Sequence, residues 1–107
     1  MRPIHLAQLD KVRPALLLTR PSVVPYLMRV TIAPITGTVR GLSTELPVGR
    51  RHGLDKDSVV SLDNITTIPR EALIKRIGYL PPDDEPALTA AIVAAFRLED
   101  DETATPR

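Results

Sequence analysis

Hydrophobic residues recur along the chain in short runs whose spacing is typical of β-strands. Some runs alternate apolar and polar positions, as half-buried strands do, and Pro or Gly separates most of them from their neighbours. A series of short strands with this punctuation predicts a small barrel. The expected strands cover residues 3–9, 13–18, 29–35, 44–48, 59–62, 64–68 and 76–80.

One of these strands is apolar at every position. The run from Ala15 to Leu18 has no polar residue, so we expect it to be covered on both faces. This strand is therefore predicted to be central in the sheet.

Helices are expected at three places. Pro21 and Pro25 bracket at most a single turn, and residues 69–74 predict a short helix that begins at Pro69. The final helix follows Asp83 or Asp84, either of which can cap it. Its apolar stripe is expected to pack on the barrel and consists of Leu88, Ile92 and Phe96, with Val93 beside them.

Composition limits the kind of protein this is. A chain of 107 residues with 43% hydrophobic and 25% charged residues predicts one folded domain. Cys is absent, which excludes disulfides, a thiol nucleophile and Cys-ligated zinc. Only 3% of residues are aromatic, so RNA binding on an aromatic platform is disfavoured. No secretory or membrane-spanning pattern is present, and we expect a cytoplasmic protein that does not bind membranes.

The net charge of +1 conceals an uneven distribution. Residues 1–82 contain 12 Lys and Arg against 6 Asp and Glu, whereas residues 83–107 contain 2 against 7. A basic body suits a polyanionic partner. Solvated surface charge would look the same, so charge alone leaves both interpretations open.

Two polar residues stand at strand ends, where a ligand could reach them. Arg13 precedes the apolar run, and its guanidinium can donate two parallel hydrogen bonds to a phosphate. Thr36 follows Pro34 and Ile35, where the chain leaves the sheet. His5 and His52 are weaker candidates for proton transfer, because a lone His is more often structural.

The ordered motifs of this chain are similar to those of the MazF/PemK family of bacterial toxin endoribonucleases. The motifs are spread from about Ile4 to Phe96, and no single one of them is specific. They read Arg13-Pro14, Ala33-Pro34-Ile35-Thr36, Gly53-Leu54-Asp55-Lys56-Asp57-Ser58-Val59-Val60, Asp63-Asn64-Ile65-Thr66-Thr67-Ile68 and Lys75-Arg76-Ile77-Gly78-Tyr79-Leu80.

The resemblance implies a mainly β fold with α: a small SH3-like barrel of the CcdB/MazF type with a C-terminal helix. It would span residues 1–98, with 99–107 as a polar, frayed tail. It also implies a homodimer that cuts single-stranded RNA at selected sequences by attack of the 2′-hydroxyl, leaving 2′,3′-cyclic phosphate and 5′-hydroxyl ends. No metal or cofactor is expected, and a cognate antitoxin would neutralise the toxin.

The resemblance also assigns candidate site residues. Arg13 and Thr36 are the expected catalytic pair, and Lys11, Thr38 and Asp63 are expected to bind substrate. The family's proton carriers are not identified by this sequence. Two other classes stay open: a gyrase poison of the CcdB type, although those proteins end in a Trp-containing tail and this chain has no Trp, and a module that binds RNA without cutting it.

Several positions depart from the family pattern. The connection from Gln8 to Val12 is much shorter than the usual Gly-rich loop. Gly37 replaces a residue that often bears a hydroxyl, Thr66 stands where an Arg is frequent, and Pro69 stands where an Asp is frequent.

Overall fold

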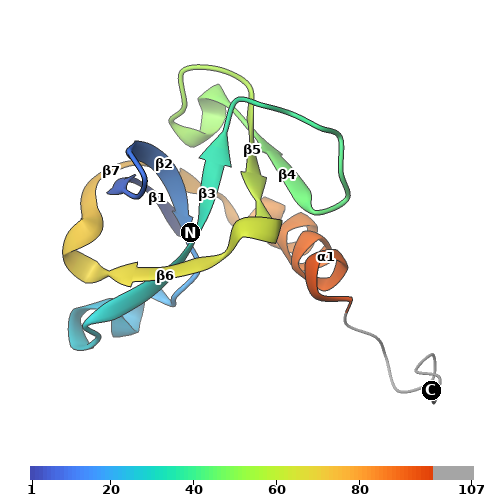
Figure 1. Cartoon of the computed structure of the whole chain (residues 1–107). Coiled ribbons are helices and arrows are strands. Elements are labelled where there is room, and N and C mark those ends of the chain that lie inside the picture. Colours follow the sequence, from blue (N-terminus) through green and yellow to red (C-terminus); the bar gives the residue numbers. More distant parts are fainter. Residues whose placement is uncertain (98–107) are drawn as a thin grey trace, which may run out of the picture.

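A computed structural model describes residues 1–97 of the chain. Its strands form one antiparallel sheet in the order β4-β5-β3-β2-β1-β7, and β6 pairs with the first half of β3. The sheet curls into a half-barrel, and an α-helix packs beneath β4 (Figure 1). The strands are β1 (Arg2–Gln8), β2 (Val12–Leu17), β3 (Arg29–Thr36), β4 (Glu45–Val48), β5 (Ser58–Ser61), β6 (Thr66–Pro69) and β7 (Leu73–Leu80), and the helix is α1 (Glu85–Phe96).

The expected mainly β fold with a C-terminal helix is confirmed. Short 3-10 turns occupy most of the connections, at Pro21–Tyr26, Arg50–His52, Leu62–Asn64, Arg70–Ala72 and Pro82–Asp84. The predicted end of the domain at residue 98 and the predicted frayed tail lie outside the described residues. Among residues 1–97, no helix has the length and apolar character needed to cross a membrane.

Strand β2 is central and buried on both faces, as its sequence predicts. Leu16 belongs to one hydrophobic cluster and Ala15 and Leu17 to another, and all three side chains are at most 2% exposed. β3 contributes to the same two clusters, since Val30 and Ile32 face one and Ala33 and Ile35 the other. The cover that β2 requires therefore comes from within one chain, and it does not by itself require a second copy.

The short helix predicted over residues 69–74 is wrong. Only Arg70–Ala72 form one 3-10 turn, and Ile74 already lies in β7. The helix does not form because Leu73 pairs with Ala7 of β1. Strand pairing over this long range outweighs a weak local preference for helix.

The apolar stripe of α1 is rotated from the prediction. Leu88 and Ala91 are buried, Ile92 and Ala95 pack against the same cluster, and Phe96 is 58% exposed. An α-helix turns once every 3.6 residues, so a stripe drawn through every fourth position drifts off the buried face after two turns. The expected packing of Phe96 is therefore wrong.

Asp84 occupies the position before α1, but its side chain makes no capping hydrogen bond. It bonds instead to Arg51 and His52, which lie on the turn before β5. The start of α1 is held to the N-terminal strand by Arg2, whose Nε lies 2.9 Å from Glu85 Oε2 and whose guanidinium donates to the Leu18 carbonyl at 2.8 Å. Asp84 therefore does not cap the helix as predicted, and its carboxylate instead makes long-range contacts with Arg51 and His52.

Two glycines allow the turn Arg50–His52 to lie directly on β7. Gly53 has φ +92°, and a β-carbon there would overlap the carbonyl of Ile77. A β-carbon on Gly78 would overlap the carbonyl of His52. Any side chain at either position would push the turn away from the sheet.

Candidate active site

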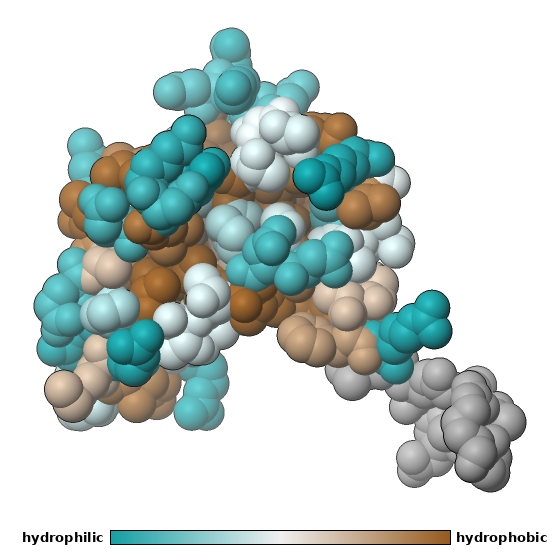
Figure 2. Space-filling view, in the orientation of Figure 1, coloured by the Kyte–Doolittle hydropathy of each residue, from teal (hydrophilic) through white to brown (hydrophobic). Residues whose placement is uncertain are grey.

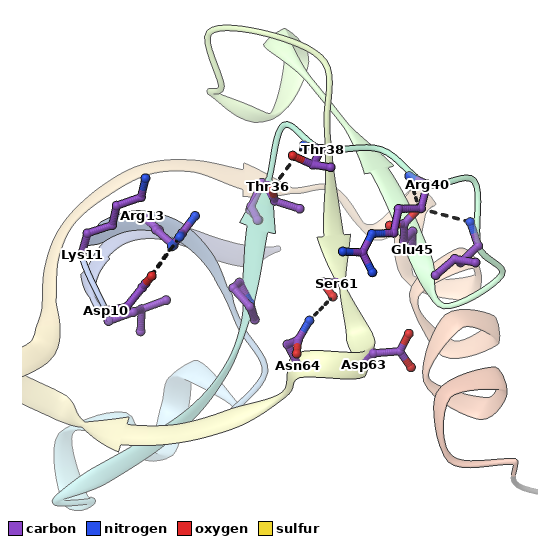
Figure 3. A pocket seen from close by; sticks show the side chains of 14 residues that line it. Asp10, Lys11, Arg13, Thr36, Thr38, Arg40, Glu45, Ser61, Asp63 and Asn64 are labelled. Carbon is purple, nitrogen blue, oxygen red and sulfur yellow. Dashed lines mark hydrogen bonds and ion pairs between the residues drawn. The ribbon is translucent and has the colours of Figure 1, made fainter.

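All five candidate site residues line one open groove of about 820 Å³. The groove runs past the turn between β1 and β2, the end of β3, the loop from residue 37 to 44, and the turn Leu62–Asn64 (Figure 3). Figure 2 shows this side of the molecule, where hydrophilic side chains surround areas in which hydrophobic residues reach the surface. The structure thus brings Lys11, Arg13, Thr36, Thr38 and Asp63 to one surface.

Arg13 is held by a fork-shaped ion pair with Asp10. Its Nε lies 2.8 Å from Asp10 Oδ1 and its Nη2 2.9 Å from Oδ2 (Figure 3). The backbone of Arg13 is fixed in β2 opposite Ala7 of β1, so the short turn places Asp10 within reach of the guanidinium. Hydrogen bonding from Arg13 holds the pKa of the Asp10 carboxyl well below its usual range, and the same bond raises the pKa of Arg13.

The sequence interpretation gave Asp10 no role in the site. A signal was present, because an acidic residue three positions before an Arg across a tight turn can form a two-bond ion pair. The carboxylate occupies the fork that a phosphate would take. A phosphate-bearing ligand would therefore compete with Asp10 for the same donors.

Thr36 ends β3, where its backbone pairs with Val59 of β5. Its Oγ1 accepts a hydrogen bond from the backbone N–H of Thr38 at 3.1 Å (Figure 3). The accepted bond orients the hydroxyl and leaves its own hydrogen available to a ligand. Thr36 can therefore donate to a phosphate oxygen in the groove.

The loop after β3 is folded into the groove wall by Glu45. Its Oε1 accepts the backbone N–H groups of Arg40 and Leu42, both at 3.1 Å. The Arg40 side chain then extends from the loop into the groove (Figure 3). Arg40 is a basic groove residue that the sequence interpretation missed, because only the fold of the loop directs it there.

Asp63 lies on the same side of the groove as this loop and forms a hydrogen bond with it. The Thr44 hydroxyl donates to its Oδ2 at 2.6 Å, and Figure 3 shows its carboxylate directed away from Arg13. Beside it, the Asn64 amide donates to Ser61 Oγ at 2.8 Å. Asp63 therefore shapes the wall, and Asn64 presents an amide group near the groove floor.

Neither histidine lines the groove. His52 is buried, with Nδ1 accepting the backbone N–H of Gly49 at 2.9 Å and Nε2 2.8 Å from Asp84. Hydrogen bonding from His52, and then the charge of Arg51, lowers the pKa of Asp84. His5 is packed in β1, where burial and the nearby Arg76 lower its pKa. Within residues 1–97, no three His, Cys, Asp or Glu side chains gather as metal ligands would.

Known proteins match this chain over nearly its whole length. The family model described as "PemK-like, MazF-like toxin of type II toxin-antitoxin system" matches residues 3–96. The endoribonuclease MazF3 of Mycobacterium tuberculosis (strain ATCC 25618 / H37Rv) is 60% identical over 99 residues, which cover 92% of this chain and 96% of that protein.

Solved structures agree with the sequence match. The Mycobacterium tuberculosis toxin MazF-mt6 superposes with a TM-score of 0.90 at 59% identity, covering 92% of this chain and 99% of that one. A mycobacterial endoribonuclease solved with its cognate antitoxin shares the fold, with a TM-score of 0.79 at 21% identity over 91% of this chain and 93% of that one.

Proposed function

Because this chain belongs to the family of PemK-like, MazF-like toxins of type II toxin–antitoxin systems, we propose that it is an endoribonuclease that cuts single-stranded RNA at selected sequences without a metal ion. The observation that carries the proposal is the groove in which Arg13, paired with Asp10, lies near Thr36. The relative at 60% identity is named an endoribonuclease. We propose that the protein acts in the cytoplasm, where it would encounter both RNA and its antitoxin.

The proposed reaction uses the RNA's own 2′-hydroxyl as the nucleophile. Its oxygen bonds to the adjacent phosphorus, the bond from phosphorus to the 5′-oxygen breaks, and a 2′,3′-cyclic phosphate and a 5′-hydroxyl result. This reaction needs a proton acceptor, a proton for the leaving oxygen, and positive charge beside the phosphorane oxygens. Side chains and water can supply all three, which is why no metal is required.

Arg13 and Thr36 are proposed to hold the scissile phosphate. The guanidinium donates two hydrogen bonds to its non-bridging oxygens, and the Thr36 hydroxyl donates a third. Lys11 and Thr38 border the same groove and are proposed to contact flanking nucleotides. Asp63 is proposed to position substrate through the wall that it forms with Thr44.

Asp10 is proposed to accept the proton of the 2′-hydroxyl. Three carboxylates line the groove, and Glu45 and Asp63 are bonded to the loop after β3 and to Thr44. Asp10 is bonded only to Arg13 among the side chains of residues 1–97, and a phosphate arriving at Arg13 releases it. Release removes the Arg13 hydrogen bonds that lower the pKa of Asp10, so the freed carboxylate is a stronger base, and water in the open groove protonates the leaving oxygen.

A homodimer is proposed from the exposed tip of the molecule. Tyr26 and Met28 are 85% and 84% exposed, and Leu27 is partly exposed beside them. Contiguous exposed apolar side chains are typical of protein interfaces, and a second copy is the occupant that the family resemblance implies.

An antitoxin is proposed to bind the groove through an acidic segment whose carboxylates replace phosphates around Arg13.

Incubation with RNA in EDTA tests the activity. We expect fragments with 5′-hydroxyl ends from the native chain, none from Arg13→Ala, and native activity from Arg50→Ala, an exposed Arg outside the groove. Intact RNA, or cutting only with added divalent metal, would contradict the proposal. RNA retained without cleavage would favour a binding module instead, and gyrase-linked DNA breaks would favour a gyrase poison.

A further inference from the structure

The side chain of Lys56 reaches the end of β3 from the loop before β5. Because Thr36 pairs with Val59, the segment that leads into β5 runs beside the residues that follow Thr36. Lys56 lies on this segment, and a β-carbon placed on Gly37 would be 2.8 Å from Lys56 Cε and 3.0 Å from Nζ. The Lys56 ammonium thus occupies the space that a side chain at position 37 would need.

Position 37 is a glycine, which leaves room for this contact. Its backbone does not require one, since Gly41 and Gly53 are the glycines with positive φ in the described part of the chain. A side chain at position 37 would meet the flexible end of Lys56 and displace its ammonium. The absence of a side chain at position 37 therefore lets the Lys56 ammonium lie beside the residue that follows Thr36.

Lys56 faces a smaller hollow that adjoins the groove. The hollow has a volume of about 260 Å³ and includes Lys11, Arg13 and Thr36 in its lining, all of which also line the groove. Lys56 is exposed, and within residues 1–97 its ammonium forms no salt bridge. The ammonium is therefore available to an anion in the hollow that adjoins the groove.

We propose that Lys56 is a substrate-binding residue, whose ammonium binds the RNA phosphate next to the one held by Arg13 and Thr36. The inference rests on the proposed RNA cleavage and adds a contact outside the catalytic pair. A lysine suits this role because its flexible stem presents a compact charge to a phosphate without fixing its orientation. Lys56 would hold the strand in register while Arg13 acts on the neighbouring phosphate.

The test compares Lys56→Met with Lys75→Met, which removes a charge from an exposed position on β7. The probe is an oligonucleotide with a cut site found by mapping 5′-hydroxyl ends, and a 2′-deoxy version measures binding without cleavage. We expect Lys56→Met to weaken binding roughly tenfold, the loss of one charge-assisted hydrogen bond. The slope of log affinity against log salt should fall by about 0.7, while Lys75→Met leaves both unchanged.

Two further measurements identify the contact. Gly37→Ala should weaken binding in the native chain by displacing Lys56, and should have no added effect in the Lys56→Met background, because the two changes act on one interaction. A methylphosphonate at the phosphate on one side of the cut site should weaken binding to the native chain and not to Lys56→Met.

The outcomes separate this inference from the proposed function. If the native chain cleaves RNA and Lys56→Met behaves like Lys75→Met, Lys56 has no substrate role and the proposed function stands. If the native chain binds RNA without cutting it, the proposed function falls, and the same variants compared on a random single-stranded RNA pool decide the role of Lys56. If it neither binds nor cuts RNA, both are overturned.

Discussion

Replacing Asp84 by Ala is expected to destabilise the fold without removing a groove residue. Asp84 Oδ2 lies 2.8 Å from Nε2 of His52, whose side chain is 5% exposed, and the Arg51 Nη2 lies 2.7 and 2.6 Å from the two carboxylate oxygens. Because Nδ1 of His52 accepts from the Gly49 N–H, Nε2 carries the hydrogen and donates it to Asp84. The variant leaves this buried donor without an acceptor.

The two lost contacts differ in size. An unpaired buried donor costs about 1–3 kcal/mol, whereas the Arg51 side chain is 59% exposed and its pair contributes at most about 1 kcal/mol. We expect a loss of about 2 kcal/mol in the free energy of unfolding, dominated by His52. For a chain of this size that lowers Tm by roughly 10 °C.

Thermal and urea unfolding followed by circular dichroism measure the loss, at one protein concentration, because dimerisation would make Tm concentration-dependent. Asp83→Ala is the matched control, since Asp83 is the exposed neighbour. Asp84→Asn, whose amide oxygen can still accept from His52, should lie between the control and Asp84→Ala. If Asp84→Ala and Asp83→Ala differ by less than about 0.5 kcal/mol, the buried hydrogen bond does not contribute as argued.

The same pair predicts a pH dependence with a definite sign. The pKa of Asp84 is lowered in the folded chain by the hydrogen bond from His52 and by Arg51. A lowered folded pKa contributes stability that is complete above the unfolded value of about 3.9 and is lost as pH falls through the folded value. The difference between the native chain and Asp84→Ala should therefore be full at pH 7 and shrink below about pH 4.

Three further outcomes follow from the described contacts. Asp10→Asn should slow cleavage at least about 10²-fold in single-turnover assays while RNA binding persists, because a proton acceptor is lost; native rates would remove Asp10 from the reaction. Gly78→Ala should destabilise the fold by at least about 3 kcal/mol, since its β-carbon would overlap the carbonyl of His52; an unchanged Tm would refute the close approach. Changing Tyr26 and Met28 together to Ser should shift a dimer toward monomer in sedimentation runs, and a dimer that survives the change would place the interface elsewhere.

The parts of the fold that depend on local pattern could be predicted from the sequence. The alternation in β3 and the unbroken apolar run in β2 report burial directly, because side chains alternate across a sheet. The start of β7 could not be predicted, since the pairing of Leu73 with Ala7 joins segments that no local signal connects.

In the candidate site, too, the residues with a local sequence signal could be predicted and those placed by long-range contacts could not. Arg13 and Thr36 follow from ordered motifs and from their positions at strand ends. Asp84 was assigned a local cap because its partners His52 and Arg51 lie more than 30 positions earlier in the chain. Arg40 reaches the groove because Glu45 folds its loop, and Lys56 reaches the adjoining hollow because β3 pairs with β5, and neither placement has a local signal in the sequence.

The pairing of β1 with β7 has a consequence for synthesis of the toxin on the ribosome. β1 is made before β7, yet Arg2 pairs with Leu80 and Ile4 with Gly78, so one edge of β1 stays unpaired until β7 has emerged. Domains fold as units during translation, so the strand that supports Arg13 reaches its final position late. We therefore expect a nascent chain that has not yet released β7 to lack the finished sheet on which the groove is built.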